Sequence, residues 1–561
     1  MADQTRQQYY NRRLSALKLE REDFIPHYKE LAEFIRPRRG RFFTSDRNKG
    51  GKKYGSIINS VATDAHRTAT AGMLAGTMSP ARPWFGLESH DPDLMEVAGV
   101  KDWLYKVELL LRTIFNESNF YSQASNLIGE LLLFGTGCMT HVDDFTDVAR
   151  FYTHTAGSYY IGQNDRHEVD TLMREFEWTA LQIVKAFGIE NVSQQIKTAI
   201  DRSSFDAWFP VVHMIEPNDE FKPQSKLGRN KPFISVYYEP GNDRASEQDR
   251  FLSTSGFDEF PAYVPRWDTT GEDTYGTDCS AMQALGDIKG LQIEEKRKAQ
   301  GIDKMVAPPL HGPPSVKNIN VTGLPSGVNV YDAGENKQEL KALYQVDLRL
   351  NELRADIDAV ERRINKAFYV DMFLAITNME GIQPRNQLDL MQRNEERLLQ
   401  LGPVLEHLQG DWLDPLIDRT FNQMVRAGIL PPPPEVLQSS PLRVKYISSL
   451  AMAQRAVATQ GIDRLALFAG GLVQQGWQSA GMKFNAEQAV DEYARAIGTP
   501  PSLVVPDEVV AQQKQAQADA QAQQIAMEQA QGAANMMKMA ADSKTDEKNV
   551  LTDAAKAATG R

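Results

Sequence analysis

The middle of the chain holds two long helix-like stretches around a break rich in proline and glycine. The first is TDCSAMQALGDIKGLQIEEKRKAQGIDKM (277–305), and the second is QVDLRLNELRADIDAVERRINKAFYV (345–370). Prolines and glycines recur between them, and neither residue is tolerated well inside a helix. The sequence therefore predicts two long helices joined by an irregular segment.

Apolar side chains recur every three or four residues in the second stretch. They are Val346, Leu350, Leu353, Ile357, Val360 and Ile364. This 3.5-residue repeat is typical of helices that pack side by side. Because the other faces are charged, we expect the helix to pack against other helices along a narrow stripe. On the pattern alone, a surface helix or a helical hairpin within one chain is the simpler interpretation.

Length and composition limit the number of domains and the ways in which the chain could bind nucleic acid. The 561 residues suggest three or four compact units, since a domain averages ~150 residues. The chain has 62 basic and 74 acidic residues, a formal net charge of −12. Proteins that grip nucleic acid without sequence preference usually carry a basic excess. Any contact with DNA should therefore be local or weak.

The sequence contains no signal for export or for a membrane. Cys138 and Cys279 are its two cysteines, which indicates reduced thiols in a reducing cytosol rather than a disulfide framework. The first thirteen residues are polar and basic, and no apolar run approaches ~18 residues. We expect a protein without a membrane-spanning segment.

Periodicity and stop signals predict the order of the remaining elements. Helices are expected at 9–36, 57–78, 100–117 and 119–134, the last ended by Gly135. Residues 141–267 are mostly strand, with one helix at 179–187. A loop follows at 371–385.

The last third of the chain is again predicted to be helical. A long helix from Asn386 should kink at Gly402 and Pro403, begin anew with Asp414 as N-cap, and end at Gly428. More helices are expected from about 450 to 497. The Ala- and Gln-rich residues 511–540 indicate a marginal helix, with disorder after about residue 539.

Enzyme signatures are weak. Gly50-Gly51-Lys52-Lys53 lacks the spacing of a phosphate-binding loop, and no GxSxG or HExxH motif occurs. His141, Asp143 and Asp144 could bind a metal, but a solvated turn is the better interpretation. Acidic residues from Asp268 to Asp278 could bind a cation, although such residues usually face water. We expect no enzyme activity, no cofactor and no metal.

Five stretches resemble the head-to-tail connector, or portal, family of short-tailed, podovirus-type bacteriophages. They are LEREDFIPHYKELAEFIRPRRGRFF (19–43), ATAGMLAGTMSPARPWF (69–85), LFGTGCM (133–139), VPRWDTTGEDTYGTDCSAMQALGDIKGLQ (264–292) and PRNQLDLMQRNEERLLQLGPVLEHLQGDWLDPLIDRTFNQMVRAGILPPPP (384–434). They follow the family order and cover most of residues 10–435. Beyond residue 440 the resemblance is vaguer.

The resemblance implies an α+β, predominantly helical portal fold, which assembles as a ring with a central channel, usually a dodecamer. Its parts would be a wing, two stem helices that pack against those of the next subunit, a clip, a channel loop and a crown. The implied boundaries are wing 1–276, first stem helix 277–305, clip 306–344, second stem helix 345–370, channel loop 371–386, kinked wing helix 387–440, crown 441–510 and tail 511–561.

The same resemblance implies a conduit for double-stranded DNA at one vertex of the virion capsid, with assembly in the host cytoplasm. Expected partners are further copies of the chain, DNA bound without sequence specificity, the large terminase, tail adaptor or nozzle proteins, and major capsid and scaffolding proteins. ATP hydrolysis would belong to the terminase, because this chain lacks a phosphate-binding loop.

Charge indicates how DNA would pass. An acidic wall repels phosphates gently across a Debye length of ~8 Å, so a strand could slip, while a few basic rings could centre or slow it. The candidate channel residues are Lys366, Arg385, Arg362 and Arg363. The alternative is that they pair with carboxylates such as those of Glu361 and Asp358.

Two other functions remain open at this level. One is a metal-dependent DNA-processing enzyme that uses Asp143, Asp144 or the Asp268–Asp278 cluster. The other is a coiled-coil scaffold protein without a channel. Metal-dependent cleavage would favour the first, and a native mass of one or two subunits would favour the second.

Overall fold

The structure is a computed structural model of the chain. Helix accounts for 54% and strand for 17%, so the chain is mixed and predominantly helical, as predicted. The described residues are 6–43, 48, 50–89, 91, 94, 97, 99–144, 148–225, 227–241, 251–312, 330, 341–342, 349–377, 401–437, 442–446, 465–474, 476–477, 483–486, 488–490, 493, 505 and 507–542.

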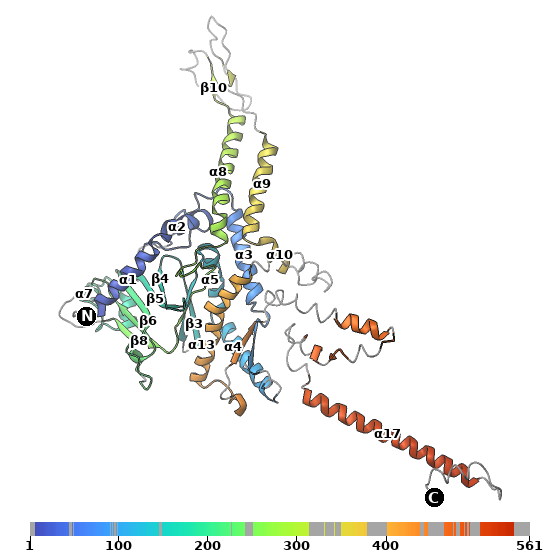
Figure 1. Ribbon diagram of the computed structural model, residues 1–561. Helices are drawn as coiled ribbons and strands as arrows, with labels where there is room; N and C mark the ends of the chain where they lie inside the picture. Colours follow the sequence, from blue (N-terminus) through green and yellow to red (C-terminus); the bar gives the residue numbers. More distant parts are fainter. Residues whose placement is uncertain are drawn as a thin grey trace.

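A helical body forms the centre of the molecule (Figure 1). Its N-terminal helices are α1 (Arg6–Glu22), α2 (Phe24–Ile35), α3 (Val61–Thr77), α4 (Val100–Glu117) and α5 (Phe120–Phe134). The side chains of α5 from Leu127 to Phe134 are all buried, and Gly135 ends the helix at φ 73°. Only glycine adopts that backbone conformation without strain, so the predicted stop is confirmed.

A five-stranded antiparallel sheet stands beside the body, with strand order β4-β5-β6-β7-β8. Its strands are β4 (Tyr159–Gln163), β5 (Val169–Thr179), β6 (Trp208–Pro217), β7 (Phe233–Tyr238) and β8 (Ser253–Phe257). Tyr160, Met173, Met214 and Val236 pair in register across four strands and bury their side chains with those of α1. The other face packs on α6 (Ala180–Phe187) and α7 (Gln194–Asp201) near one end.

The predicted helix after Thr179 is confirmed, and its beginning is fixed by a capping box. The Thr179 hydroxyl accepts a hydrogen bond from the Gln182 backbone, and the Gln182 side chain accepts one from the Thr179 backbone. Two N–H groups at the helix start are thereby satisfied. Gly188 ends the helix.

Two smaller sheets connect distant parts of the sequence. One has the order β3-β2-β9, built from β2 (Cys138–Asp144), β3 (Val148–His154) and β9 (Ala262–Tyr263). The other pairs β1 (Phe85–Ser89) with β12 (Leu442–Tyr446) in antiparallel register. The family resemblance assigned residues 441–510 to a crown of helices, and this was wrong for residues 442–446, which form a strand. Their alternating LRVKY pattern suits a half-buried strand, and β1 supplies the backbone partners.

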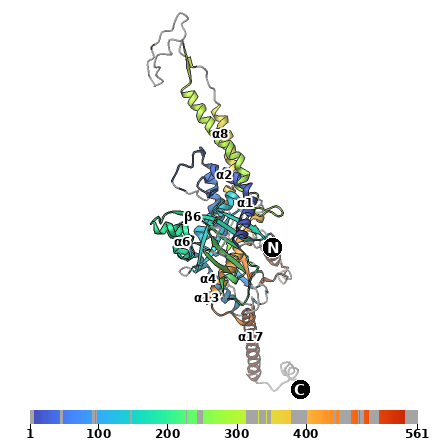
Figure 2. The same ribbon diagram turned by 90° about the vertical axis from the view of Figure 1, so that its left-hand side faces the viewer.

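Two long helices rise from the body side by side (Figures 1 and 2). They are α8 (Ser280–Val306) and α9 (Leu350–Ala367), and a short pair of strands, β10 (Leu310–His311) and β11 (Lys341–Ala342), joins the chain just beyond them. Most of residues 313–348 lie outside the described residues. After α9 the chain forms α10 (Val370–Thr377), so the prediction of a loop was wrong for residues 371–377. Buried Met372 and Phe373 draw this segment onto the body.

Residues 402–427 form one continuous helical run. It consists of α12 (Gly402–Leu408), a π-helical turn (Gln409–Leu413) and α13 (Asp414–Ala427). Asp414 has helical dihedral angles, so the prediction that it caps a new helix was wrong. The π turn removes the need for a break, because it widens the helix where Pro415 cannot donate a hydrogen bond. The predicted end at Gly428 is confirmed, with φ 65°.

The C-terminal tail is helical from Asp507 to Asp542 in α17. Exposed Ile525 and Met527 show that this helix keeps apolar side chains in solvent. Within the described residues, no helix combines the length and the apolar character that crossing a membrane requires.

Candidate functional site

The apolar stripe of α9 is buried within the chain itself. Ile357, Val360 and Ile364 are 3%, 4% and 0% exposed in the main core, and Leu353 packs partly buried beside them. The lower part of the stripe thus joins α9 to α8 and α3. The family resemblance had led us to expect that this stripe packs against the next subunit. Its lower part is instead already covered within the chain. Val346 lies outside the described residues, and the side chain of Leu350 is likewise not described.

A buried glutamine ties both long helices to the start of α3. The Gln292 side chain of α8 accepts hydrogen bonds from the backbone N–H groups of Ile58 and Asn59, at 2.6 and 2.8 Å, and donates one to the Asn59 carbonyl at 3.0 Å. The Asn59 side chain then donates to Glu361 of α9 at 2.8 Å. One loop therefore fixes the spacing of α8 and α9 at their base.

Ion pairs add to this attachment on the outside. The Arg363 guanidinium of α9 contacts the Asp287 carboxylate of α8, with Nη2 and Oδ1 2.9 Å apart. Lys289 of α8 pairs with Glu30 of α2. Both pairs are partly exposed, so we expect them to orient the helices more than to stabilise them.

The bend between α9 and α10 is held in an unusual backbone conformation. Tyr369 has φ 54°, which costs a non-glycine residue roughly 1–2 kcal/mol. Its neighbour Phe368 is fully buried, and Phe373 of α10 lies against Gly72 of α3. Packing on both sides of Tyr369 therefore fixes the direction in which the chain leaves α9.

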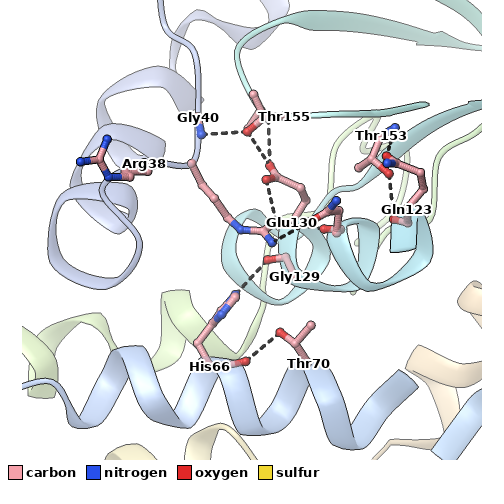
Figure 3. Close-up of polar contacts among 12 residues, drawn as sticks. Arg38, Gly40, His66, Thr70, Gln123, Gly129, Glu130, Thr153 and Thr155 are labelled. Carbon is pink, nitrogen blue, oxygen red and sulfur yellow. Dashed lines mark hydrogen bonds and ion pairs between the residues drawn. The ribbon is translucent and has the colours of Figure 1, made fainter. Parts of the chain in front are cut away.

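A buried carboxylate secures the body below this bend (Figure 3). Glu130 of α5 is 3% exposed and accepts hydrogen bonds from Arg39, Thr155 and the backbone N–H of Ala156, at 2.9, 3.0 and 3.0 Å. Nearby, His66 of α3 donates from Nε2 to the Gly129 carbonyl at 2.9 Å.

His66 is neutral in the folded protein. Burial is the main cause that lowers its pKa to about 3, and the positive charge of Arg39 adds to the effect. A neutral ring suits its surroundings, because it lies edge-on to Phe368 at the end of α9. His66 therefore adds no charge to the buried region beneath the long helices.

The four candidate DNA residues differ in their surroundings. Lys366 and Arg362 are exposed near the lower end of α9. Arg363 is compensated by Asp287, a carboxylate of α8 rather than the Glu361 or Asp358 considered from the sequence. Arg385 lies outside the described residues.

Two of the residues considered for metal binding, His141 and Asp143, make structural contacts. His141 is buried and its Nδ1 lies 2.6 Å from the Tyr263 hydroxyl. Asp143 accepts a hydrogen bond from Gln423 and pairs with Arg419 at 3.5 Å. In the described part of the chain, no group of three or more His, Cys, Asp or Glu side chains is arranged to hold a metal.

Sequence reasoning missed three residues that build the site. Gln292 stands at a core-facing position of an otherwise apolar stripe, and that mismatch was a usable signal. Gly72 stands in an alanine-rich helix, where a glycine indicates close approach of another element. Tyr369 carries no local signal, because its backbone conformation is imposed by packing.

Comparison with known proteins gives the family. The sequence profile described as "Bacteriophage head to tail connecting protein" matches residues 7–505. The chain is 41% identical over 569 residues to the probable portal protein of Bordetella phage BPP-1, covering 100% of both chains. It is 40% identical over 552 residues to the portal protein of Salmonella phage epsilon15, covering 98% of this chain and 97% of the relative. The chain therefore belongs to the family of bacteriophage head-to-tail connecting, or portal, proteins.

Proposed function

We propose that copies of this chain form a closed ring, most simply a dodecamer, in which the α8–α9 pairs surround a channel for double-stranded DNA. The observation that carries the proposal is the attachment of this pair to the body. Because the apolar stripe of α9 is used within the chain, the faces left outside are charged. Such faces suit contacts with solvent, with neighbours and with a passing polyelectrolyte.

The remaining parts are assigned by their position in the chain. Residues 1–276 and 387–440 form the wing, 306–344 the clip, 378–386 the channel loop, and 447–510 the crown. The clip presents the ring to the large terminase during packaging and to tail adaptor proteins afterwards. Major capsid and scaffolding proteins contact the wing. The ring is a virion component without catalytic activity of its own, assembled in the host cytoplasm.

Charge determines how DNA moves in this proposal. A chain of net charge −12 makes the ring acidic, which disfavours tight binding of phosphates. Exposed Lys366 and Arg362 would repeat around the ring and supply a narrow basic band. We propose that Lys366 and Arg385 are the main residues that contact DNA. Arg363 contributes less, because Asp287 compensates its charge.

Electron microscopy and native mass spectrometry of the purified chain test this function. We expect rings with an open centre at micromolar protein concentration. A native mass of one or two subunits at every concentration would overturn the ring and favour a scaffold without a channel. Cleavage of duplex DNA that depends on added Mg²⁺ or Mn²⁺ would favour the enzyme instead.

A further inference from the structure

Positive charge is concentrated in the segment that follows α2, although the whole chain is acidic. We name the described residues 36–43, 48 and 50–53 the basic segment. They contain no carboxylate and the following basic residues: Arg36, Arg38, Arg39, Arg41, Lys52 and Lys53. Arg38, Arg41 and Lys52 are exposed. The segment thus offers an unusual basic surface on this protein.

Three guanidinium groups converge where the segment begins. A hydrogen bond of 2.9 Å from the Thr63 hydroxyl to the Ile35 carbonyl holds the end of α2 against α3. This contact brings Arg36 near Arg67 of α3 and near Arg39, which already uses the Glu130 carboxylate.

The charge of Arg36 is poorly compensated. Burial, together with the charges of Arg39 and Arg67, lowers its pKa. Among the described residues, no hydrogen bond or ion pair to its side chain is found. Arg67 pairs with Asp64 at 3.5 Å and Arg39 with Glu130 at 2.9 Å, so the three guanidinium groups share two carboxylates. An excess of positive charge favours an acidic partner from outside the subunit.

A cluster of acidic residues lies on the loop between β9 and α8. We name residues 268–278 the acidic loop, which contains Asp268, Glu272, Asp273 and Asp278 and no lysine or arginine. Asp268 and Glu272 are exposed. The loop contacts the end of α1, where Thr274 donates a hydrogen bond to Glu20 at 2.5 Å, so acidic residues of that helix extend the surface.

The two surfaces lie at opposite ends of β4. The basic segment is held just before this strand, where the Arg41 backbone N–H donates to the Ala156 carbonyl at 2.8 Å. The acidic loop is held at the last residue of the strand, where the Gln163 side chain donates to the Glu272 carbonyl at 2.6 Å. The strand β4, five residues long, runs between these anchors and spans roughly 15 Å. The two segments also project from opposite sides of the body in Figure 2.

We propose that the basic segment of one copy docks on the acidic loop of the next copy. This inference rests on the proposed ring and names two surfaces that would form it. Different surfaces on opposite sides produce a head-to-tail contact, which closes into a ring when the rotation per subunit allows. Complementary charge favours this register over a two-fold pair that would bring two basic segments together.

A charge-swap experiment on the full-length chain tests the contact. One variant reverses the basic side (Arg41→Glu with Lys52→Glu), a second reverses the acidic side (Asp268→Lys with Glu272→Lys), and a third combines all four changes. Assembly is measured by sedimentation velocity over a range of protein and salt concentrations. Thermal melting of each variant shows whether the subunit remains folded.

The pattern across the three variants decides the outcome. We expect each single-sided reversal to raise the concentration for half-assembly at least tenfold, and the combined variant to recover to within about threefold. Normal assembly of either single-sided variant, or no recovery in the combined one, overturns the inference. Normal rings that lose binding of a duplex DNA probe would assign the basic segment to nucleic acid, and this too overturns it.

Disulfide trapping supplies a geometric test. Lys52→Cys combined with Glu272→Cys should give a ladder of covalent oligomers under mild oxidation, because natural Cys138 and Cys279 are buried. Lys52→Cys combined with Ser203→Cys is the control, with a second thiol at the end of α7. Rings without a ladder would overturn this contact alone, whereas failure of the unaltered chain to form rings would overturn the proposed function.

Discussion

Gly72 of α3 lies so close to Phe373 of α10 that a Cβ atom on the glycine would stand 2.3 Å from the Phe373 Cβ. Real Cβ atoms do not approach that closely, so the two helices depend on the missing side chain. The contact sets where the chain leaves α9 and enters the proposed channel loop.

Gly72→Ala should therefore destabilise the body by about 1–3 kcal/mol, the usual range for an overpacked core. Urea unfolding measures the loss. Gly286→Ala is the matched control, because that glycine is exposed in α8 with no atom within 4 Å of the added carbon. The control should gain up to about 1 kcal/mol from helix propensity. Equal stability of both variants would contradict the close contact.

Gln292→Leu should loosen the base of the long helices. The change leaves the N–H groups of Ile58 and Asn59 without their acceptor, which we expect to cost about 2 kcal/mol in unfolding free energy. Hydrogen exchange at these two amides should accelerate first. Gln300→Ala on the exposed face of the same helix should leave both measurements unchanged.

The stability of variants at position 369 should depend on how well the new residue adopts a left-handed backbone conformation. At φ 54°, asparagine is tolerated and a β-branched residue is not. Tyr369→Asn and Tyr369→Val both lose the ring, and partial burial against the core favours valine over asparagine, so a less stable valine variant reports the backbone. We expect the valine variant to be less stable by about 1 kcal/mol in urea unfolding. A valine variant as stable as the asparagine variant would show that the bend is relaxed.

Glu108 of α4 should make stability depend on pH. Burial raises the pKa of its carboxyl to about 7 from an ordinary value of 4.5, despite the nearby Arg112. The folded state therefore holds this proton more tightly than the unfolded state, and its contribution to stability is lost as pH rises from about 4.5 through about 7.

Glu108→Gln removes that titration. The variant should gain up to about 3 kcal/mol relative to the unaltered protein at pH 8, and much less at pH 4.5. Urea unfolding at the two pH values measures this. Glu117→Gln, on an exposed part of the same helix, should show no such difference. A constant offset at both pH values would rule out the buried titration.

Charge reversal at Lys366 should affect DNA without affecting assembly. Lys366→Glu replaces one positive charge per subunit with a negative one at the lower end of α9, and we expect packaged or retained DNA to fall several-fold. Packaging assays and electron microscopy of particles measure the two effects. Lys185→Glu on exposed α6 is the control and should behave as the unaltered chain. Normal packaging and retention with Lys366→Glu and with Arg385→Glu would remove both residues from the channel assignment.

Local signals in the sequence predicted local structure well. The stops at Gly135 and Gly428 follow from left-handed backbone angles, and the start at Thr179 follows from its capping partner. The repeat in α9 identified its buried face, since periodicity reports which side is apolar. It could not report that α8 and α3 cover this face, because a partner in space leaves no mark on the helix itself.

Features that depend on distant contacts were missed for the same reason. The π turn before Pro415 and the strand at residues 442–446 need partners far away in the sequence. Glu130 is a charged residue in an otherwise apolar part of its helix, and only the fold reveals the arginine and the turn that it binds. Among the candidate channel residues, the charged pattern of the sequence correctly indicated that Lys366 is exposed. It could not indicate that Asp287 compensates the charge of Arg363, because these two residues are far apart in the sequence.

The pairing of Phe85–Ser89 with Leu442–Tyr446 has a consequence for biosynthesis. The ribosome must synthesise and release the chain beyond residue 446 before β1 can pair with β12. Each newly made subunit thus stays incomplete until translation is well into its final quarter.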